Sequence, residues 1–380
     1  MRLLFTTAPL RGHFFPLVPL AWAARAAGHD VLVATAERFV PTVLQAGLPA
    51  ADAGPGADFV DLIADEAGDT AHGSLQRRTA HGRAFGRIAR QLLPGMSSLI
   101  RAMRPDVVVS ERAEFAGRLA AAAAGVPFVE YQWGVAPLDE YRAGATAELG
   151  RELPEPAEVL HPWPPSMRLP YAAAHQGIRD VVFNGAARVD DWIFERGPRP
   201  RVCVTFGTVV PRLRMPHLQS IVLPTLERLG SLGVQILVAA DPEAVASWPA
   251  LPEAVYRVGR LPLGQVLPTC DLVVNHGGQG TVLTSLVAGC PQLVLPQFDD
   301  QFDNAEAVVR AGAGLSLAPA EVTPELVALR ARELLEEPRF GRAAGIVATE
   351  IAAQPSPAEL VGVLEKVRHY YPSEPDRMCA

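Results

Sequence analysis

The sequence has few cysteines, no long apolar run and no excess of positive charge, and each absence excludes a class of protein. Its four cysteines, Cys203, Cys270, Cys290 and Cys379, form no CxxC pair and no close His/Cys set. We therefore expect reduced thiols, three of them buried. No apolar run approaches the ~20 residues that a membrane-spanning helix needs. The formal net charge of −7 indicates no basic surface for a nucleic acid.

A signal peptide is not expected either. Arg11, Gly12 and His13 interrupt the apolar residues LLFTTAPL, and a strand–helix–strand pattern follows them. These features predict a cytoplasmic protein without nucleic-acid or integral-membrane partners. At 380 residues, of which 49% are hydrophobic, the chain is long enough for two domains with a core each.

Short apolar runs alternate with helical patterns along both halves of the chain. The runs lack strict alternation of polar and apolar residues, which indicates parallel strands covered on both faces. Two such arrays in tandem predict an α/β protein with two Rossmann-like domains. Neither opening loop carries the GxGxxG of a dinucleotide-binding site, which argues against an NAD enzyme. The strands are expected at residues 2–8, 30–36, 106–110, 127–131, 201–206, 234–240, 255–258, 271–275, 293–296 and 314–317.

The domain boundary is predicted in the polar, proline-bearing stretch ERGPRPR, which divides the chain into residues 1–195 and 196–380. Residues 137–172, with six prolines between Pro154 and Pro170, and residues 51–75 are expected to be irregular. The former is interpreted as part of a ligand-binding wall. A last helix is predicted over about 356–371, with Ser356 as its N-cap and Pro357 at its first position.

Residues 271–304 carry the most specific signal. The strand DLVVN leads directly into His276, Gly277 and Gly278, and a helix begins near Gly280 and Thr281. The unpaired N–H groups at a helix N-terminus, with its positive dipole, form an anion site, and glycines let a phosphate approach closely. Taken singly, the glycines also fit a plain turn, and His276 also fits a satisfied loop histidine.

Asp299, Asp300 and Gln301 follow the next strand. Carboxylate and amide groups at the C-terminal end of such a strand suit sugar hydroxyls. The combined pattern therefore predicts a diphosphate site with a sugar beside it.

In this pattern the chain resembles the nucleotide-sugar glycosyltransferases of the GT-B class, and most of all the family-1 enzymes that glycosylate small natural products. The resemblance implies two tandem Rossmann-like domains with parallel sheets facing across a cleft, and a last helix that packs back on the first domain. It assigns the diphosphate to His276 and Thr281 with the backbone of Gly277, Gly278 and Gly280. It assigns the sugar to Asp300 and Gln301. Within TFGT, residues 205–208, it places Thr208 against the diphosphate.

The N-terminal residues TTAPLRGHFFPLVPL resemble the opening strand, loop and helix of the same family. There the loop histidine is the general base, which corresponds to His13, and imidazole suits that role near neutral pH. The orienting acid ends the strand that matches DVVVS, which corresponds to Glu111. Glu114 is a rival for that role, and Asp106 lies too far back. His29 is expected to satisfy carbonyls at a helix end instead of acting as the base.

For the nucleotide base, the family often uses a tryptophan, and here Arg260 and Leu261 occupy its place. Arginine can also stack on a base. The stretches TAELGRELPEP and PPSMRLP resemble actinomycete enzymes that add TDP-deoxysugars to polyketide antibiotics. This implies an apolar acceptor. Core packing is the alternative for each candidate acceptor contact, namely Phe14, Phe15, Tyr131, Trp133 and Trp163.

Together these features predict an inverting, metal-independent transfer of a sugar from a TDP-sugar or UDP-sugar to a small hydrophobic aglycone, without a cofactor. Asp299-Asp300 could imitate a metal-binding pair, but Gln301 beside it favours sugar contacts. Two alternatives are a GT-B-type sugar-nucleotide epimerase and a catalytically silent binding protein. The resemblance leaves open the identity of the sugar and aglycone, the atom glycosylated, a homodimer and an activator protein.

Overall fold

In the first half of the protein, the residues of the strands face two different hydrophobic cores. A computed structural model describes residues 1–66, 75–207, 216–245, 248 and 250–370. In the first strand, β1 (Arg2–Thr6), Leu3 and Phe5 belong to the core on one face of the sheet, and Leu4 belongs to the core on the other. Every strand pair in this sheet is parallel. Helices therefore cover both faces, as the apolar runs predicted.

The first sheet has the order β3-β2-β1-β4-β5-β6-β7. Its strands after β1 are β2 (Asp30–Thr35), β3 (Ala50–Asp52), β4 (Val107–Glu111), β5 (Phe128–Tyr131), β6 (Glu158–His161) and β7 (Gln176–Gly177). Its helices are α1 (Arg11–Phe14), α2 (Val18–Ala26), α3 (Val40–Gln45), α4 (Phe59–Glu66), α5 (Leu75–Met103), α6 (Phe115–Ala123) and α7 (Asp139–Leu149).

The second sheet is also parallel, with the order β10-β9-β8-β11-β12-β13. Its strands are β8 (Arg201–Thr205), β9 (Gln235–Ala239), β10 (Val255–Gly259), β11 (Leu272–Asn275), β12 (Gln292–Val294) and β13 (Gly314–Ser316). Its helices are α8 (Pro216–Gly230), α9 (Pro242–Val245), α10 (Leu263–Val266), α11 (Gln279–Val287), α12 (Asp300–Arg310), α13 (Pro324–Glu336) and α14 (Pro338–Ala353). The predicted boundary at residues 195 and 196 falls in the connection between β7 and β8.

The two stretches predicted to be irregular contain regular structure. Residues 137–172 form α7, β6 and two short 3-10 helices, and residues 51–75 include the end of β3 and the helix α4. The prolines of the first stretch fall in the connections and at helix starts, where a missing N–H is tolerated. The expectation of two long loops was therefore wrong.

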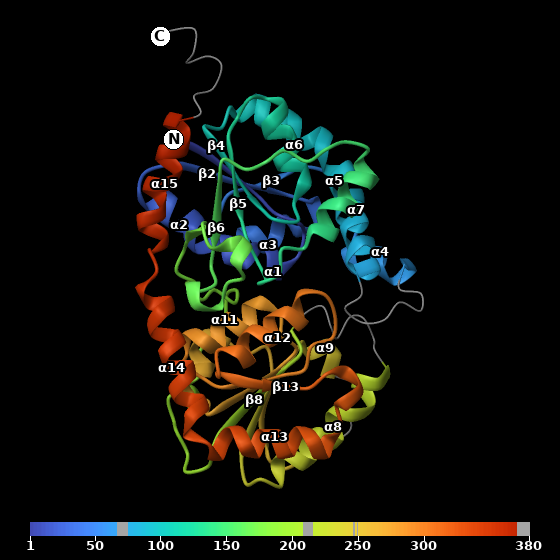
Figure 1. Ribbon diagram of the computed structural model, residues 1–380, viewed down its shortest axis with the longest axis vertical. Coiled ribbons are helices and arrows are strands. Elements are labelled where there is room, and N and C mark those ends of the chain that lie inside the picture. The colour runs from blue at the N-terminus through green and yellow to red at the C-terminus, as the bar shows by residue number, and fades with distance from the viewer. Residues whose placement is uncertain (67–74, 208–215, 246–247, 249, 371–380) are drawn as a thin grey trace.

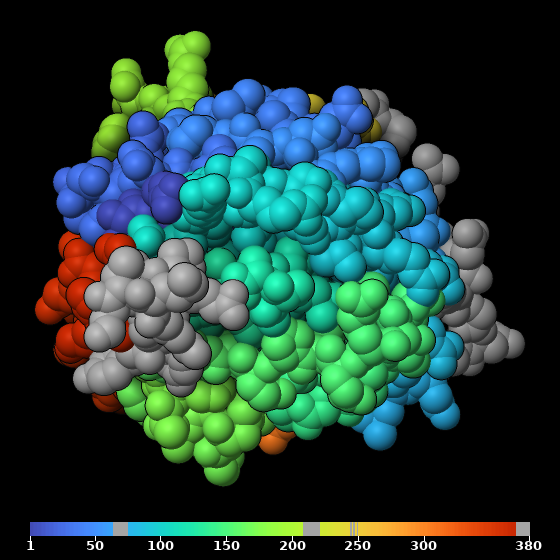
Figure 2. Space-filling view, turned by 90° about the horizontal axis from the view of Figure 1, so that it is seen from above, coloured from blue at the N-terminus to red at the C-terminus, as the bar shows by residue number. Residues whose placement is uncertain are grey.

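The last helix, α15 (Pro357–Tyr370), follows α14 along one side of the molecule, and the two together span both sheets (Figure 1). Its residues Leu360, Val361, Leu364 and Val367 join the core of the first sheet, where α15 packs on α2. In the view from the end of the first domain, α15 lies at the surface beside the N-terminal residues (Figure 2). The C-terminal segment of the chain therefore fastens the second domain to the first.

Among the described residues, no helix combines the length and apolar character that crossing a membrane requires. Cys203, Cys270 and Cys290 are free and buried, as predicted. Burial raises the pKa of the Cys270 thiol to about 12, so this thiol stays protonated and unreactive at neutral pH.

Candidate functional site

A cavity of about 360 Å³ lies between the two domains. The first domain contributes residues from α1, α3, α4, α5 and α7, and the second contributes residues at or after the ends of β8, β9, β10, β11 and β12. Ligands of parallel α/β sheets bind beyond the carboxyl ends of the strands, which is where this cavity lies. The cavity brings together most of the residues that the sequence pattern selected from each half of the chain, in particular His13, Trp133, Arg260, Leu261, His276, Gly278, Gly280, Thr281, Asp300 and Gln301.

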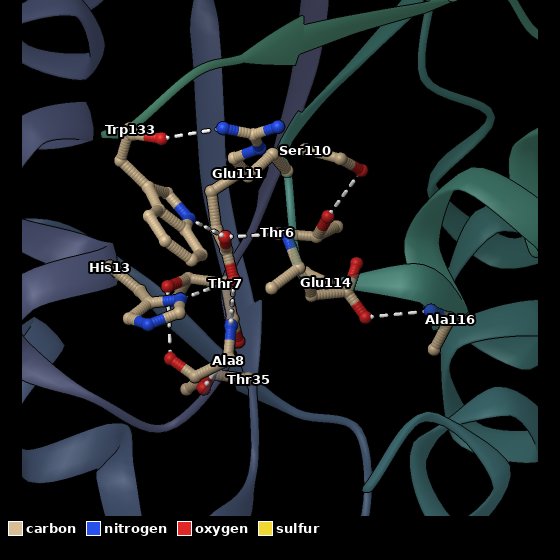
Figure 3. A network of polar contacts seen from close by, with 12 residues as sticks. Thr6, Thr7, Ala8, His13, Thr35, Ser110, Glu111, Glu114, Ala116 and Trp133 are labelled. Atoms are coloured by element: carbon tan, nitrogen blue, oxygen red, sulfur yellow. Dashed lines mark hydrogen bonds and ion pairs between the residues drawn. The ribbon is translucent and has the colours of Figure 1, made fainter. Parts of the chain in front are cut away.

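His13 lines this cavity with a carboxylate behind it. Its Nδ1 lies 3.0 Å from Oε1 of Glu111, and Figure 3 shows the two side chains meeting beneath Trp133. The contact arises because β1 and β4 are neighbours, so the loop after β1 and the end of β4 meet at the same edge of the sheet. The ring of Trp133 packs 4.7 Å from that of His13, centroid to centroid. The Glu111 carboxylate holds the Nδ1 side of the His13 ring, which leaves Nε2 as the nitrogen for proton transfer.

Glu111 is fully buried and accepts from several donors. Oε1 accepts from the Ala8 N–H at 3.1 Å, and Oε2 accepts from the Ala113 N–H at 2.8 Å and the Trp133 indole N–H at 2.7 Å. Burial by itself raises the pKa of the Glu111 carboxyl, but the charge of His13 and these hydrogen bonds outweigh it and lower the pKa below its ordinary value. The carboxyl is therefore ionised at neutral pH.

The rival partners have other contacts. Glu114 caps α6 by accepting from the N–H groups of Ala116 and Gly117. Asp106 accepts from the Arg2 N–H at the opposite end of β1. His29 contacts Glu365 at the far end of α15. Of Glu111, Glu114 and Asp106, the structure therefore places Glu111 in contact with His13.

His276 stands at the start of α11 with glycines on both sides of its ring. A Cβ on Gly207 would lie 2.6 Å from Cε1 of His276, and a Cβ on Gly278 would lie 2.4 Å from its Nε2. Side chains at these two positions would displace the imidazole. Burial lowers the pKa of His276 to about 4, against the smaller opposing effect of a hydrogen bond with the Thr205 backbone, so the ring is neutral at pH 7 and carries a single N–H.

The N-terminus of α11 is arranged much as predicted, with one difference. Gly278 is the N-cap residue. The N–H groups of Gln279 and Gly280, in the first turn, have no carbonyl acceptor within the helix. Gly277, which was predicted to bind the diphosphate, instead donates its N–H to Oδ1 of Asn275 at 2.8 Å. Its backbone donor is already used. Thr208 lies outside the described residues.

Asp300 and Gln301 begin α12 and face the same cavity. Oδ2 of Asp300 accepts from the Asn304 side-chain amide at 2.8 Å. Burial, with the charge of neighbouring Asp299, raises the pKa of the Asp300 carboxyl to about 6. Oε1 of Gln301 accepts from the Gln297 N–H at 2.9 Å, so the amide NH₂ is the part of Gln301 that is free to donate to a ligand.

Asp299 has the most unusual backbone conformation of the three residues Asp299, Asp300 and Gln301. Its φ of 50° with ψ of −125° is a conformation that glycine favours, which costs a side-chain-bearing residue about 1–3 kcal/mol. Its carboxylate contacts His81 and accepts from the Tyr141 hydroxyl at 2.6 Å. Burial raises the pKa of this carboxyl, but His81 and Tyr141 outweigh the burial and lower it below its ordinary value.

Arg260 and Leu261, which the sequence predicted at the nucleotide base, also line the cavity. Arg260 donates to Oδ2 of Asp241 at 2.7 Å, and Asp241 also lines the cavity. The ion pair is largely exposed, so it holds the guanidinium only weakly. Arg260 can therefore turn its flat face toward a base.

Three of the predicted acceptor contacts are wrong. Phe14 and Tyr131 lie in the core of the first sheet, and neither borders the cavity. Trp163 is fully buried, with its indole N–H donated to Oε1 of Gln279 at 2.8 Å. Core packing, the alternative considered for these side chains, explains all three.

Phe15 and Trp133 do line the cavity. The remaining aromatic wall was not predicted from the sequence: Phe59 from α4, Phe85 from α5, Tyr141 from α7, Phe183 from the segment after β7 and Phe298 from the loop before α12. The apolar spacing of Phe85, Ile88 and Leu92 could have revealed α5 as a helix with one face to the interior. Nothing in the spacing shows that Phe85 faces a ligand space.

Comparison with known proteins identifies the family. The model of the erythromycin biosynthesis protein CIII-like N-terminal domain matches residues 22–207, and that of the CIII-like C-terminal domain matches residues 224–367. L-demethylnoviosyl transferase of Streptomyces niveus is 40% identical over 328 residues, which are 83% of this chain and 85% of that protein. The chain belongs to this glycosyltransferase family. A further relative of this chain is elloramycin glycosyltransferase ElmGT of Streptomyces olivaceus. It is 35% identical over 96% of this chain and 97% of its own length.

Solved structures agree with the family and the fold. Glycosyltransferase SsfS6 of Streptomyces sp. SF2575, complexed with thymidine diphosphate, superposes with a TM-score of 0.82 at 33% identity and covers 96% of this chain and 99% of its own. Spinosyn rhamnosyltransferase SpnG superposes with a TM-score of 0.84 at 31% identity over 96% and 100% of the two chains. The chain therefore has the GT-B fold, and the comparisons support a glycosyltransferase, not an epimerase or a silent binding protein.

Proposed function

We propose that this glycosyltransferase moves a deoxysugar from a TDP-sugar to a small, apolar aglycone of the polyketide antibiotic type. One observation carries the proposal: a single cavity holds His13, backed by Glu111, together with the N-terminus of α11 and the pair Asp300 and Gln301. A base, an anion site and a sugar site in one space are the components of a glycosyl transfer. The relatives' substrates support the choice of ligands, since SsfS6 was solved with thymidine diphosphate and ElmGT is named for elloramycin.

In the proposed reaction, Nε2 of His13 removes the proton of an acceptor hydroxyl as that oxygen attacks the anomeric carbon. The bond from the anomeric carbon to the diphosphate breaks on the opposite face, and its electron pair leaves with the diphosphate. Attack from the opposite face inverts the configuration of the sugar. Glu111 stabilises the imidazolium that forms, because its carboxylate is already ionised and in contact with the ring.

The leaving diphosphate gains its stabilisation from fixed donors. These are the first N–H groups of α11, the Thr281 hydroxyl and the neutral ring of His276, all preorganised by the fold. We infer that this donor set serves in place of a metal ion and that no cofactor beyond the sugar nucleotide takes part. Asp300 and the free NH₂ of Gln301 are assigned to the sugar hydroxyls.

The aromatic wall supports an apolar acceptor. Phe15, Phe59, Phe85 and Phe183 line the cavity without adding a charge, and the ring of Phe85 lies 5.2 Å from that of His13. Flat apolar ligands gain most from such a surface. We place the reaction in the cytoplasm because the buried cysteines are free thiols.

The test is a matrix of TDP- and UDP-sugars against aromatic polyketide aglycones and macrolactones, with product mass read by mass spectrometry. The expected result is an aglycone heavier by one deoxysugar residue, formed in metal-chelated buffer and with TDP-sugars preferred. Conversion of the donor sugar to an epimer without any acceptor would overturn the proposal, and so would a requirement for a divalent ion.

A further inference from the structure

Asp299 belongs to the second domain, yet three side chains of the first domain hold it. Nδ1 of His81 contacts its Oδ2, and the Tyr141 hydroxyl donates to the same oxygen at 2.6 Å. Arg78 donates to the Asp299 carbonyl at 3.1 Å and pairs with the carboxylate of Asp303 one turn into α12. His81 and Asp299 are 3% and 1% exposed, so these contacts form with little competition from water.

The three holding side chains stand on a rigid support. His81 and Arg78 come from α5, Tyr141 comes from α7, and these two helices pack along each other. Their approach is so close that a Cβ on Gly82 would lie 2.4 Å from the carbonyl oxygen of Tyr141. The ring of Phe298 meets that of His81 edge-on at 6.2 Å. The packing of α5 and α7 therefore brings the His81 and Tyr141 side chains to the same oxygen of Asp299.

What they hold is the loop that carries the sugar-binding pair. Asp299 directly precedes Asp300 and Gln301, and Oε1 of Gln301 accepts from the N–H groups of Gln297 at 2.9 Å and Phe298 at 3.4 Å. Residues 297–301 thus form one hydrogen-bonded unit. Its backbone turns at Asp299 in a conformation that glycine favours, and an aspartate keeps such a conformation only where its surroundings enforce it.

We propose that His81, Arg78 and Tyr141 are positioning residues that clasp the 297–301 loop to the first domain. The sugar site is then complete only when the two domains are closed on each other, which couples sugar recognition to domain closure. The proposal rests on the proposed function, because it takes Asp300 and Gln301 as the sugar contacts. None of the three residues needs to touch the diphosphate or the nucleotide base.

The experiment compares the affinity for TDP with the affinity for TDP-glucose and TDP-rhamnose by calorimetry, in the wild-type chain and in the variants His81→Ala, Tyr141→Phe and Asp299→Ala. We expect each variant to bind TDP within about twofold of wild type. Binding of the TDP-sugars should weaken by about tenfold or more, the effect of losing a charge-assisted hydrogen bond. The double variant His81→Ala/Tyr141→Phe should lose no more than Asp299→Ala, since both act through that carboxylate.

The matched control is Glu350→Ala. Glu350 also crosses the domains, accepting from the backbone and side chain of Ser166, but it lies away from the sugar loop. We expect this variant to bind TDP and the TDP-sugars like wild type.

The outcomes distinguish a failure of the proposed clasp from a failure of the proposed glycosyltransferase function. Melting temperatures that fall in the His81 and Tyr141 variants while TDP-sugar affinities stay at the wild-type values would reduce the clasp to a plain packing contact and overturn this proposal. An equal loss in the Glu350 variant would do the same, because any cross-domain contact would then suffice. A wild-type chain that binds neither TDP nor a TDP-sugar would instead overturn the proposed function itself.

Discussion

Replacing Glu111 with glutamine tests the catalytic geometry most directly, because the change keeps the shape of the side chain while it removes the negative charge and turns one acceptor oxygen into an NH₂ donor. Around the carboxylate lie the Ala8, Ala113 and Trp133 donors and the Nδ1 of His13. The glutamine amide offers one acceptor oxygen, so its NH₂ group faces two of these four neighbours. At about 1–3 kcal/mol for each buried group left unpaired, we expect the free energy of unfolding to fall by about 2–6 kcal/mol.

The loss of turnover should exceed what this instability explains. Without the carboxylate, neither the orientation nor the charge of the His13 imidazolium is supported, and we expect the rate of transfer to fall by about 10²–10⁴, the usual share of a positioned base. The assay is single-turnover transfer at a temperature where circular dichroism shows the variant to be folded. His13→Ala/Glu111→Gln should be no slower than His13→Ala, because the two residues act as a unit.

Glu114→Gln is the matched control. Glu114 is a second buried carboxylate of the same region, and its donors are backbone N–H groups at the start of α6. Its loss should cost about 1 kcal/mol of stability, as for a helix cap, with turnover unchanged. The reasoning on Glu111 would be refuted if both variants lost the same activity, or if the losses from His13→Ala and Glu111→Gln multiplied.

Other predictions follow from the same site. His13→Ala should lower turnover by about 10²–10⁴ with unchanged TDP affinity by calorimetry; a wild-type rate would remove His13 from the mechanism. His276→Ala and Thr281→Ala should each weaken TDP binding by about 1–3 kcal/mol, and unaltered affinity in both would contradict the diphosphate site. The Asp300 carboxyl, with its pKa raised to about 6, should become protonated below that pH, so TDP-sugar affinity should fall relative to TDP affinity between pH 7 and 5, and Asp300→Asn should flatten this dependence. Because the ordinary pKa of an unfolded aspartate is about 3.9, ionised Asp300 destabilises the fold above pH 6. That cost should disappear as the pH falls toward 4, and thermal unfolding of wild type and Asp300→Asn across this range measures it.

The apolar runs predicted the parallel sheets, whereas the family resemblance predicted the pairing of His13 with Glu111; the parallel sheet explains why the two residues meet. Strands buried on both faces show as uninterrupted apolar runs, and neighbouring parallel strands end at one edge of the sheet. The loop after β1 and the last residue of β4 must therefore meet. The short strands β3, β6 and β7 escaped prediction because they lie toward the edges of the sheet and have only two to four residues each.

The acceptor wall could not be read with the same accuracy. Phe14 and Phe15 are adjacent and chemically identical, but successive residues of a helix point about 100° apart. One enters the core and the other the cavity. The sequence could not predict the partners of Asp299, because His81 and Tyr141 are 218 and 158 residues away in the chain. Only the folded packing of α5 and α7 brings them to that loop.

Trp133 carries a consequence for changing the range of aglycones that the enzyme accepts. Its indole ring forms part of the wall against which an acceptor would lie, and its N–H supports the Glu111 carboxylate behind the base. Trimming this side chain to enlarge the pocket would therefore also loosen the catalytic pair. Phe59 and Phe183 line the same cavity with no polar atom to lose, so a library built on those two positions can reshape the pocket while leaving the chemistry intact.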